Sequence, residues 1–239
     1  MIPFRLWVYL QTTPLFWLTA TLAAYIVADR IALAAGRHPL VNPVAIAIAL
    51  VGALLALTGT DYQTYFNGAQ FVHFLLGPAT VALAVPLYRN VGLVRRNLLP
   101  MAAALMVGAV VAVVSALAVA RALGAPRAVL VSLAPKSVTA GVAMAVSETL
   151  GGAPPLTAVL VIATGIIGAI MVTPLMNALG IRDYAARGFA VGLASHGIGT
   201  ARAFAVDPVA GVFAGIAMGL NAVVTPAIIP VLLPWLAGQ

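Results

Sequence analysis

Two basic residues, Lys136 and Arg202, lie deep inside apolar stretches of the chain, where charged side chains are rare. Lys136 lies roughly 13 Å along a helix from the start of its stretch, near Ala128. A charge at that depth in a lipid bilayer costs about 2.5 to 3.5 kcal/mol, so it normally faces the protein interior or an aqueous cavity. An ammonium and a guanidinium are suited to bind a carboxylate, which predicts an anion site.

Polar residues and a proline surround Lys136 in the sequence Ala134-Pro-Lys-Ser-Val-Thr139. Pro135 removes a backbone donor and disturbs the preceding turn, so a new half-helix is expected to begin here. Its free N–H groups, the Lys136 ammonium and the hydroxyls of Ser137 and Thr139 together form a receptor for an anion. The alternative is a proline-kinked helix in which both hydroxyls bond to their own backbone.

Three further polar residues within apolar stretches have structural interpretations. Glu148 is either an interfacial residue or the ion-pair partner of Lys136, but about 18 Å of straight helix separates the two, so they cannot pair within one helix. His73 is interpreted as a gating or packing residue, and Asn221 as a hydrogen-bonding contact between helices.

Arg202 follows a glycine-rich stretch, Ser195-His-Gly-Ile-Gly-Thr200. His196 and Thr200 are four residues apart and share a helical face, so a site that contains one is expected to contain the other. His196 is either a proton carrier or a structural imidazole bonded to a carbonyl. Arg202 either binds the carboxylate or extends toward Asp207.

A second segment, Leu76-Gly-Pro-Ala-Thr80, resembles the stretch at 196–200. Both interrupt an apolar stretch with helix-weakening residues and a hydroxyl, which is typical of solute sites in membrane proteins. An Asp–Tyr pair precedes each segment and a proline follows each: Asp61-Tyr62 and Pro86 in one case, Asp183-Tyr184 and Pro208 in the other. The pattern predicts an internal duplication in which Thr80 and Thr200 are equivalent hydroxyl ligands.

The elements that must position these residues are membrane segments. Hydrophobic residues make up 63% of the chain, charged residues 7%, and the mean hydropathy is +1.12, which is outside the range of soluble domains. A helix needs about 20 residues to cross the bilayer. The stretches of suitable length are 14 to 35, 41 to 60, 67 to 88, 97 to 120, 128 to 150, 156 to 180, 188 to 206 and 208 to 236.

The distribution of arginines predicts the orientation of the loops. Basic residues place the loops near Arg30 and Arg37, near Arg95, and near Arg182 in the cytoplasm. One single transmembrane domain, 1–239, is then expected to hold repeat 1 (14–120) and an inverted repeat 2 (128–236). Eight full crossings do not satisfy this orientation, so one segment must re-enter the membrane, and the breaks at Gly77-Pro78 and Pro135 are the candidates.

Several classes of function are disfavoured. The net charge of +7 is dispersed, without the basic face that nucleic acid requires, and the chain has no cysteine for thiolate metal sites. The apolar stretches contain no pair of carboxylates that could bind a metal cation. The sequence also has no hydrolase or nucleotide-binding motif that would indicate an enzyme. We therefore expect no enzyme activity, cofactor or metal. Gln11 and Pro14 interrupt the first apolar run, so a cleaved signal peptide is not expected.

Several motifs resemble one family of membrane proteins. They are Leu75-Leu-Gly-Pro-Ala-Thr-Val-Ala-Leu-Ala-Val-Pro-Leu-Tyr88, Pro135-Lys-Ser-Val-Thr139, Gly151-Gly152 with Leu156-Thr-Ala158, and Ser195-His-Gly-Ile-Gly-Thr-Ala-Arg-Ala203. Their order is similar to that of the LrgB/CidB family from about Asn42 to Pro230. The chain has Ala140-Gly141 where the family usually has a proline, which puts a second kink there in doubt.

The resemblance implies a multi-pass protein of the bacterial inner membrane that is holin- or antiholin-like and modulates murein hydrolase export and lysis. It also implies a smaller membrane partner of the LrgA/CidA type. Plant relatives are similar to a plastid carrier of glycolate and glycerate, which implies transport of small monocarboxylates.

Together these patterns predict an all-α integral membrane protein, a polytopic bundle of about eight segments with inverted repeats. The expected function is secondary transport of small organic anions of the glycolate, glycerate, lactate or pyruvate class, by proton coupling or exchange, in a homodimer. The alternative is a holin-like pore or lysis regulator that acts by oligomerisation. The expected substrate ligands are Lys136, Ser137, Thr139, Arg202, Thr80, Thr200 and, for proton coupling, His196.

Overall fold

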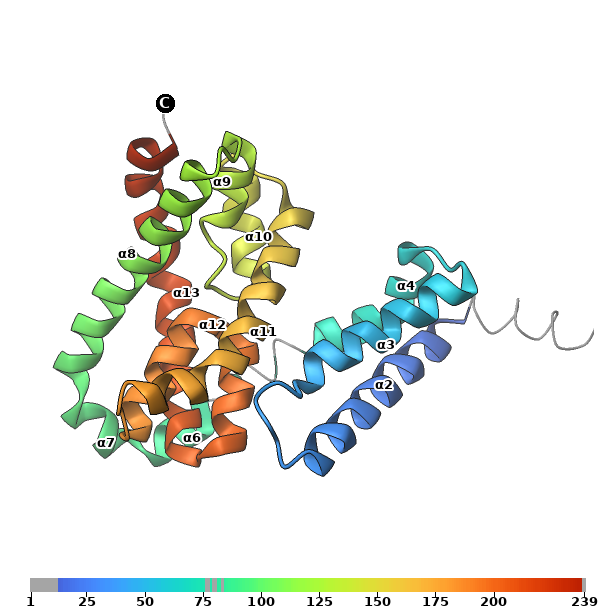
Figure 1. Ribbon diagram of the computed structural model, residues 1–239, viewed down its shortest axis with the longest axis horizontal. Coiled ribbons are helices and arrows are strands. Elements are labelled where there is room, and N and C mark those ends of the chain that lie inside the picture. Colours follow the sequence, from blue (N-terminus) through green and yellow to red (C-terminus); the bar gives the residue numbers. More distant parts are fainter. Residues whose placement is uncertain (1–12, 76–77, 79–80, 83, 238–239) are drawn as a thin grey trace, which may run out of the picture. The chain divides into compact units, whose positions relative to one another are not determined.

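The computed structural model describes residues 13–75, 78, 81–82 and 84–237, and all regular structure in them is helical (Figure 1). The chain divides into two compact units, residues 1–84 and 85–239. This boundary does not coincide with the expected repeats, 14–120 and 128–236, which stay a prediction. Thr80 and Gly77 of the first motif lie outside the described residues.

The first unit contains three helices, α2 (Pro14–Ala34), α3 (Pro43–Thr58) and α4 (Tyr62–Phe74), and α2 packs against both others. The closest contact lies between α2 and α4, where a Cβ on Gly68 would collide with the carbonyl oxygen of Pro14. The Trp17 ring is fully buried there and contacts Tyr65 edge-on, with ring centroids 5.8 Å apart. Glycine and aromatic packing therefore hold α2 to α4.

The two Asp–Tyr pairs have the same local role, since each aspartate caps a helix that begins at the tyrosine. The Asp61 carboxylate accepts from Thr64 N before α4, and the Asp183 carboxylate accepts from Ala186 N before α12 (Tyr184–Val206). The Thr64 hydroxyl also donates to Asp61 and lowers the pKa of its carboxyl, so this cap persists as the pH falls below the ordinary value.

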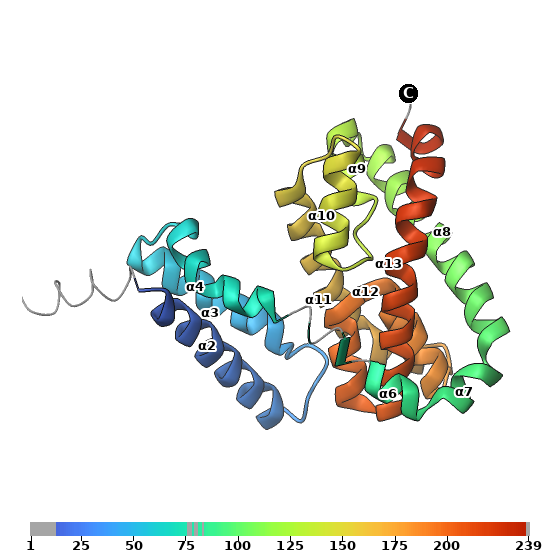
Figure 2. The same cartoon turned by 180° about the vertical axis from the view of Figure 1, so that it is seen from behind.

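The second unit is organised around its last helix. Its elements are α6 (Ala84–Arg89), α7 (Val91–Arg96), α8 (Leu98–Ala122), α9 (Arg127–Leu133), α10 (Ala140–Thr149), α11 (Pro154–Ala178), α12 (Tyr184–Val206) and α13 (Pro208–Ala237). Helix α13 packs against α8, α9, α10 and α12 (Figure 2). Helix α11 packs instead against α12, α10 and α9.

Four helices in the described residues are long and apolar enough to cross a membrane: Pro14–Ala34, Leu98–Ala122, Pro154–Ala178 and Pro208–Leu236. The expected number of about eight segments is not confirmed. Helix α3 is apolar but short, the stretch 67–88 lies partly outside the described residues, and the stretches 128–150 and 188–206 are both interrupted. Hydropathy detects such stretches but does not show whether each is one straight helix.

The stretch 128–150 forms a helical hairpin, here called the first hairpin, made of α9, the loop 134–139 and α10. The break at Pro135 was expected, and the structure places it at the loop between two half-helices. After the hairpin the chain returns to the level of its first arm, because Ala153 N donates to the Ser132 hydroxyl at 2.8 Å. The two arms therefore run in opposite directions instead of crossing the layer once.

The stretch 184–206 forms the second hairpin. Its outgoing arm (184–194) and return arm (197–206) meet at Ser195 and His196, whose backbone angles are not helical. Tyr184 and Val206 line the same small cavity, although about 33 Å would separate them along a straight helix. Helix α12 is therefore two half-helices folded against each other.

The two hairpins approach the middle of α13 from opposite ends. Near the start of α13, Gly188 and Gly192 of the outgoing arm lie directly against the backbone of Ala210 and Ala214. Near its other end, α9 shares an apolar cluster with Ile229 and Leu233. The turns of both hairpins consequently face each other around the centre of α13.

Candidate functional site

The tips of the two hairpins are joined by one side chain of α13. The Asn221 amide nitrogen donates to the carbonyl oxygen of Ser137 in the first hairpin at 3.3 Å and to that of Leu193 in the second at 3.0 Å. Its amide oxygen accepts from the Thr225 hydroxyl at 2.6 Å, and both α13 side chains are 1% exposed. We call this arrangement the hairpin junction.

The break in the second hairpin is held by close contacts with α11. His196 has φ 42°, a positive value that non-glycine residues rarely adopt, and strain of this kind clusters at functional sites. Its Nε2 lies 2.9 Å from the carbonyl oxygen of Val161. A Cβ on Gly165 would lie 2.7 Å from its ring, so the glycine makes room for the imidazole.

Lys136 lies in the loop of the first hairpin and is half-buried. Its ammonium lies 3.3 Å from the hydroxyl of Ser137, and it is near enough to His196 of the second hairpin to disfavour a positive charge on that ring. Glu148 is exposed near the end of α10 and forms no ion pair with Lys136. The alternative of an ion pair between these two residues is therefore not observed, and Lys136 lies beside Ser137, whose carbonyl oxygen belongs to the hairpin junction.

Each hairpin begins its return half-helix at its tip. Helix α10 begins at Ala140 after Thr139, whose half-buried side chain makes no capping hydrogen bond, and the return arm of the second hairpin begins after His196. The first N–H groups of a helix lack intrahelical acceptors and carry roughly half a positive charge. Two positive helix ends and the Lys136 ammonium thus surround one place in the fold.

Ser195 adds a hydroxyl that the fold itself does not use. Its Oγ is buried and has no hydrogen-bond partner among the described residues, and the side chain is 1% exposed. It lies against Gly168 of α11, directly before the strained His196. Buried hydroxyls are normally satisfied, so an unsatisfied one directly before the return half-helix of the second hairpin indicates a place for an additional polar group.

Two of the expected ligands have structural partners instead. The Thr200 hydroxyl donates to the carbonyl oxygen of His196 at 2.8 Å, a bond to its own backbone that is frequent in membrane helices. Arg202 lies further along the return arm, where its guanidinium donates to the Thr173 hydroxyl at 3.4 Å. Along α11, Thr173 lies about 12 Å from Gly165, which contacts His196. The structure therefore does not bring Arg202 to the hairpin junction.

The structure brings together Lys136, Ser137, Thr139 and His196 of the expected set. Asn221 forms the contact between helices that its sequence position indicated, whereas Ser195 was not counted as a ligand. An amide that is isolated in a long apolar segment was the available signal for Asn221. The lack of a partner for Ser195 is visible only in three dimensions.

Comparisons with known proteins identify the family. The model of the LrgB-like family matches residues 21–235. Holin-like protein CidB of Staphylococcus epidermidis is 34% identical over 82% of this chain and 86% of its own length. Holin-like protein CidB of Staphylococcus aureus is also 34% identical, over the same shares. Uncharacterized protein YwbG of Bacillus subtilis is 33% identical over 82% of this chain and 87% of its own.

No solved structure matches the chain. The family names agree with the holin-like alternative better than with organic anion transport, which no named relative among these specifies. Four helices of membrane-spanning length and these relatives indicate a membrane protein. The LrgB/CidB resemblance of the motifs is thereby confirmed, and the chain belongs to the LrgB-like family.

Proposed function

We propose that the protein is holin-like, as its relatives are named, and modulates murein hydrolase export and lysis from within the cytoplasmic membrane. The identity to holin-like CidB proteins over most of both chains supports this function. The described fold differs from a plain bundle of straight membrane-spanning helices, because two of its apolar stretches fold back as hairpins. We therefore propose further that the solute pathway is selective.

The second proposal is that the hairpin junction binds and carries small organic anions, of the glycolate, glycerate, lactate or pyruvate class. One observation carries it: two half-helices begin at the junction, one shortly after Lys136 and the other directly after Ser195 and His196, and the Ser195 hydroxyl has no partner among the described residues. A carboxylate placed there would receive hydrogen bonds from free backbone N–H groups and a charge-assisted bond from Lys136. The Ser195 hydroxyl would donate to a second oxygen of the anion.

His196 is the proposed proton-coupling group, since its ring lies at the break of the second hairpin and near the charge of Lys136. Arg202 is assigned an outer role in this proposal. It shares a small cavity with Arg187 near the base of the second hairpin, where two guanidinium groups would attract an anion before it reaches the junction.

Transport in liposomes tests both proposals and separates them. The purified full chain is reconstituted, and uptake of radiolabelled glycolate is measured beside release of a neutral sugar. Saturable glycolate uptake that falls at least about tenfold in Lys136→Ala, and survives in Lys136→Arg, supports the carrier, because a charge-assisted bond is lost only in the first.

A holin-like pore without a site predicts a different result. Glycolate and the neutral sugar then cross together without saturation, and the Lys136→Ala variant behaves as the wild type does. Equal glycolate uptake by wild type and Lys136→Ala would exclude the proposed role of Lys136, whatever the mode of passage.

A further inference from the structure

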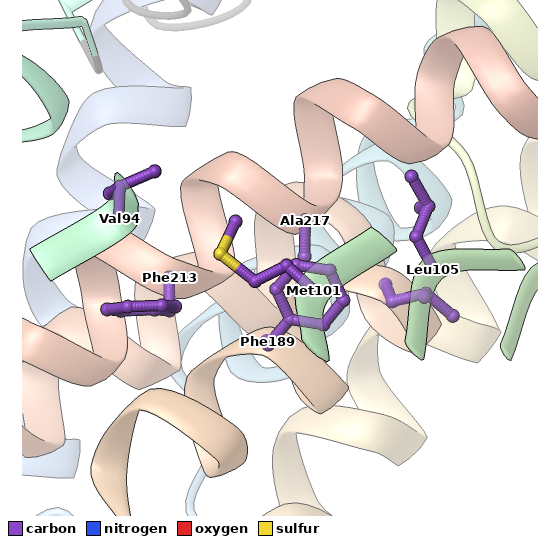
Figure 3. Close-up of a cluster of buried hydrophobic side chains, with 7 residues drawn as sticks. Val94, Met101, Leu105, Phe189, Phe213 and Ala217 are labelled. Atoms are coloured by element: carbon purple, nitrogen blue, oxygen red, sulfur yellow. The ribbon is translucent and has the colours of Figure 1, made fainter. Parts of the chain in front are cut away.

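A large apolar cavity lies between α8 and the outgoing arm of the second hairpin, and only its inner end, at Leu193, reaches a residue of the hairpin junction. Its volume is about 510 Å³. Met101 and Ala104 of α8, Phe189 and Ala186 of the outgoing arm, and Phe213 of α13 line it. Figure 3 shows Met101, Phe189 and Phe213 gathered in the buried cluster that forms its floor. The views in Figures 1 and 2 show α8 diverging from α13 toward α7 on this side.

The cavity is a wedge that closes halfway along α8. At its closed end a Cβ on Gly108 would lie 2.9 Å from the Leu193 side chain, so the two helices touch there. At its open end lie Asn97, which precedes α8, and Asp183, which caps α12. The stretch from Asn97 to Gly108 is about 16 Å long in a helix. This equals about half of the roughly 30 Å hydrocarbon layer, or one leaflet.

The length of the wedge indicates what kind of molecule fills it. A transmembrane helix from a second copy or a partner needs the full thickness of the layer, and the contact of Gly108 with Leu193 blocks its path. An acyl chain of one leaflet needs only the observed depth. The apolar lining of aliphatic and aromatic side chains suits a hydrocarbon chain.

The open end of the wedge is positively charged. Arg95 and Arg96 directly precede Asn97, Arg182 directly precedes Asp183, and all three arginines are exposed. The Asp183 carboxylate opposes them, but it accepts the capping bond from Ala186 N and its charge is outnumbered. By the positive-inside rule this end faces the cytoplasm, where anionic lipids concentrate positive segments at the membrane surface.

We infer that the wedge binds one acyl chain of an anionic phospholipid from the cytoplasmic leaflet, with the phosphate group at Arg95, Arg96 and Arg182. The apolar depth selects a lipid tail, and the arginines select a negatively charged headgroup. This inference stands apart from the proposed function, because none of the wedge residues that carry it belongs to the expected substrate ligands.

Native mass spectrometry of the full chain in detergent tests the tail site. The protein is titrated with phosphatidylglycerol, and the fraction that carries bound lipid is measured. Ala104→Phe places a ring in the wedge and is expected to remove the bound lipid, whereas Ala103→Phe, one residue away and not among the lining residues, should retain it. Equal lipid binding by both variants would overturn the inference.

The headgroup site is tested with lipids that share acyl chains but differ in charge. The wild type is expected to prefer phosphatidylglycerol to phosphatidylcholine, and Arg96→Gln and Arg182→Gln should each reduce this preference about fivefold. These exposed substitutions leave the packing intact, so they remain informative if Ala104→Phe fails to fold. Equal binding of both lipids by the wild type, or a change of oligomeric state in Ala104→Phe without loss of lipid, would contradict the proposal.

Discussion

The two hairpins of the second unit reach the same place by different physical means. The first is held by hydroxyl groups: the Thr157 hydroxyl donates to that of Ser147 at 2.7 Å, and Ala153 N donates to the Ser132 hydroxyl. The second is held by close contact of backbones, since Gly188 and Gly192 leave no space for a Cβ against α13. Hydrogen bonds and small residues are the two means by which helices associate in membranes.

The turns of the two hairpins also differ, in length and in backbone conformation. The first hairpin turns through the six residues 134–139, which include Lys136 and contain backbone turn hydrogen bonds such as Val138 N to Pro135 O. The second turns within two residues, and His196 adopts a positive φ to do so. The junction therefore combines a longer turn that holds polar side chains with a tight turn that depends on an unusual backbone conformation.

We expect the greatest loss of stability when a side chain is added at the glycine contacts of the second hairpin. In Gly192→Val the new side chain would meet the backbone of Ala214, which cannot move aside, so we expect a loss of about 3 kcal/mol in the free energy of unfolding. Gly219→Val is the matched control, because no atom lies within 4 Å of a Cβ at that position. Unfolding in mixed detergent micelles measures both, and equal stability would show that the contact is not rigid.

Asn221→Leu is expected to have the next largest effect, because it separates the two hairpins. It leaves the carbonyl groups of Ser137 and Leu193 without their donor, at a cost of about 2 kcal/mol. The natural chain has no cysteine, so a single Ser137→Cys change reports on access to the tip. This cysteine should react faster with a maleimide in the Asn221→Leu background than in the wild type. Unchanged reactivity would mean that Asn221 does not hold the tips together.

Thr157→Val tests whether hydroxyl contacts stabilise the first hairpin. The variant loses the hydroxyl bond to Ser147 and should be destabilised by about 1 kcal/mol, the usual size of such a bond between membrane helices. Thr164→Val on the same helix is the control, since its hydroxyl donates to its own backbone at Leu160. If both variants unfold at the same detergent concentration, the hydroxyl contacts do not hold the first hairpin.

Ser195→Ala should have the smallest effect on stability, because the hydroxyl that it removes has no partner among the described residues. The midpoint of unfolding is expected to stay at the wild-type value or to rise slightly. Glycolate uptake, in contrast, should fall if the hydroxyl serves a bound anion. A destabilised Ser195→Ala protein with normal uptake would assign the hydroxyl to the fold.

Much of the candidate site could be predicted from local sequence. Proline at 135 and the glycines around His196 weaken helices wherever they occur, and both breaks are present. The depth of Lys136 in an apolar stretch likewise indicated an interior position, and its ammonium is half-buried beside Ser137. The roles of Arg202 and Thr200 were less accessible, because Thr173 and the His196 carbonyl compete for them in the folded chain.

Composition and hydropathy were sufficient to predict a helical membrane protein, because a spanning segment must satisfy its own backbone groups in lipid and apolar stretches of about 20 residues have the length of a spanning helix. Proline and glycine indicated the two breaks that the described residues contain, at Pro135 and at His196. Only the tertiary structure decided that the broken stretches turn back as hairpins, that four helices in the described residues have spanning length, and that Asn221 joins the tips. Hydropathy is a property of each residue, whereas a returning arm is stabilised by partners far away in the chain, such as Gly192 with Ala214 and Ser137 with Asn221.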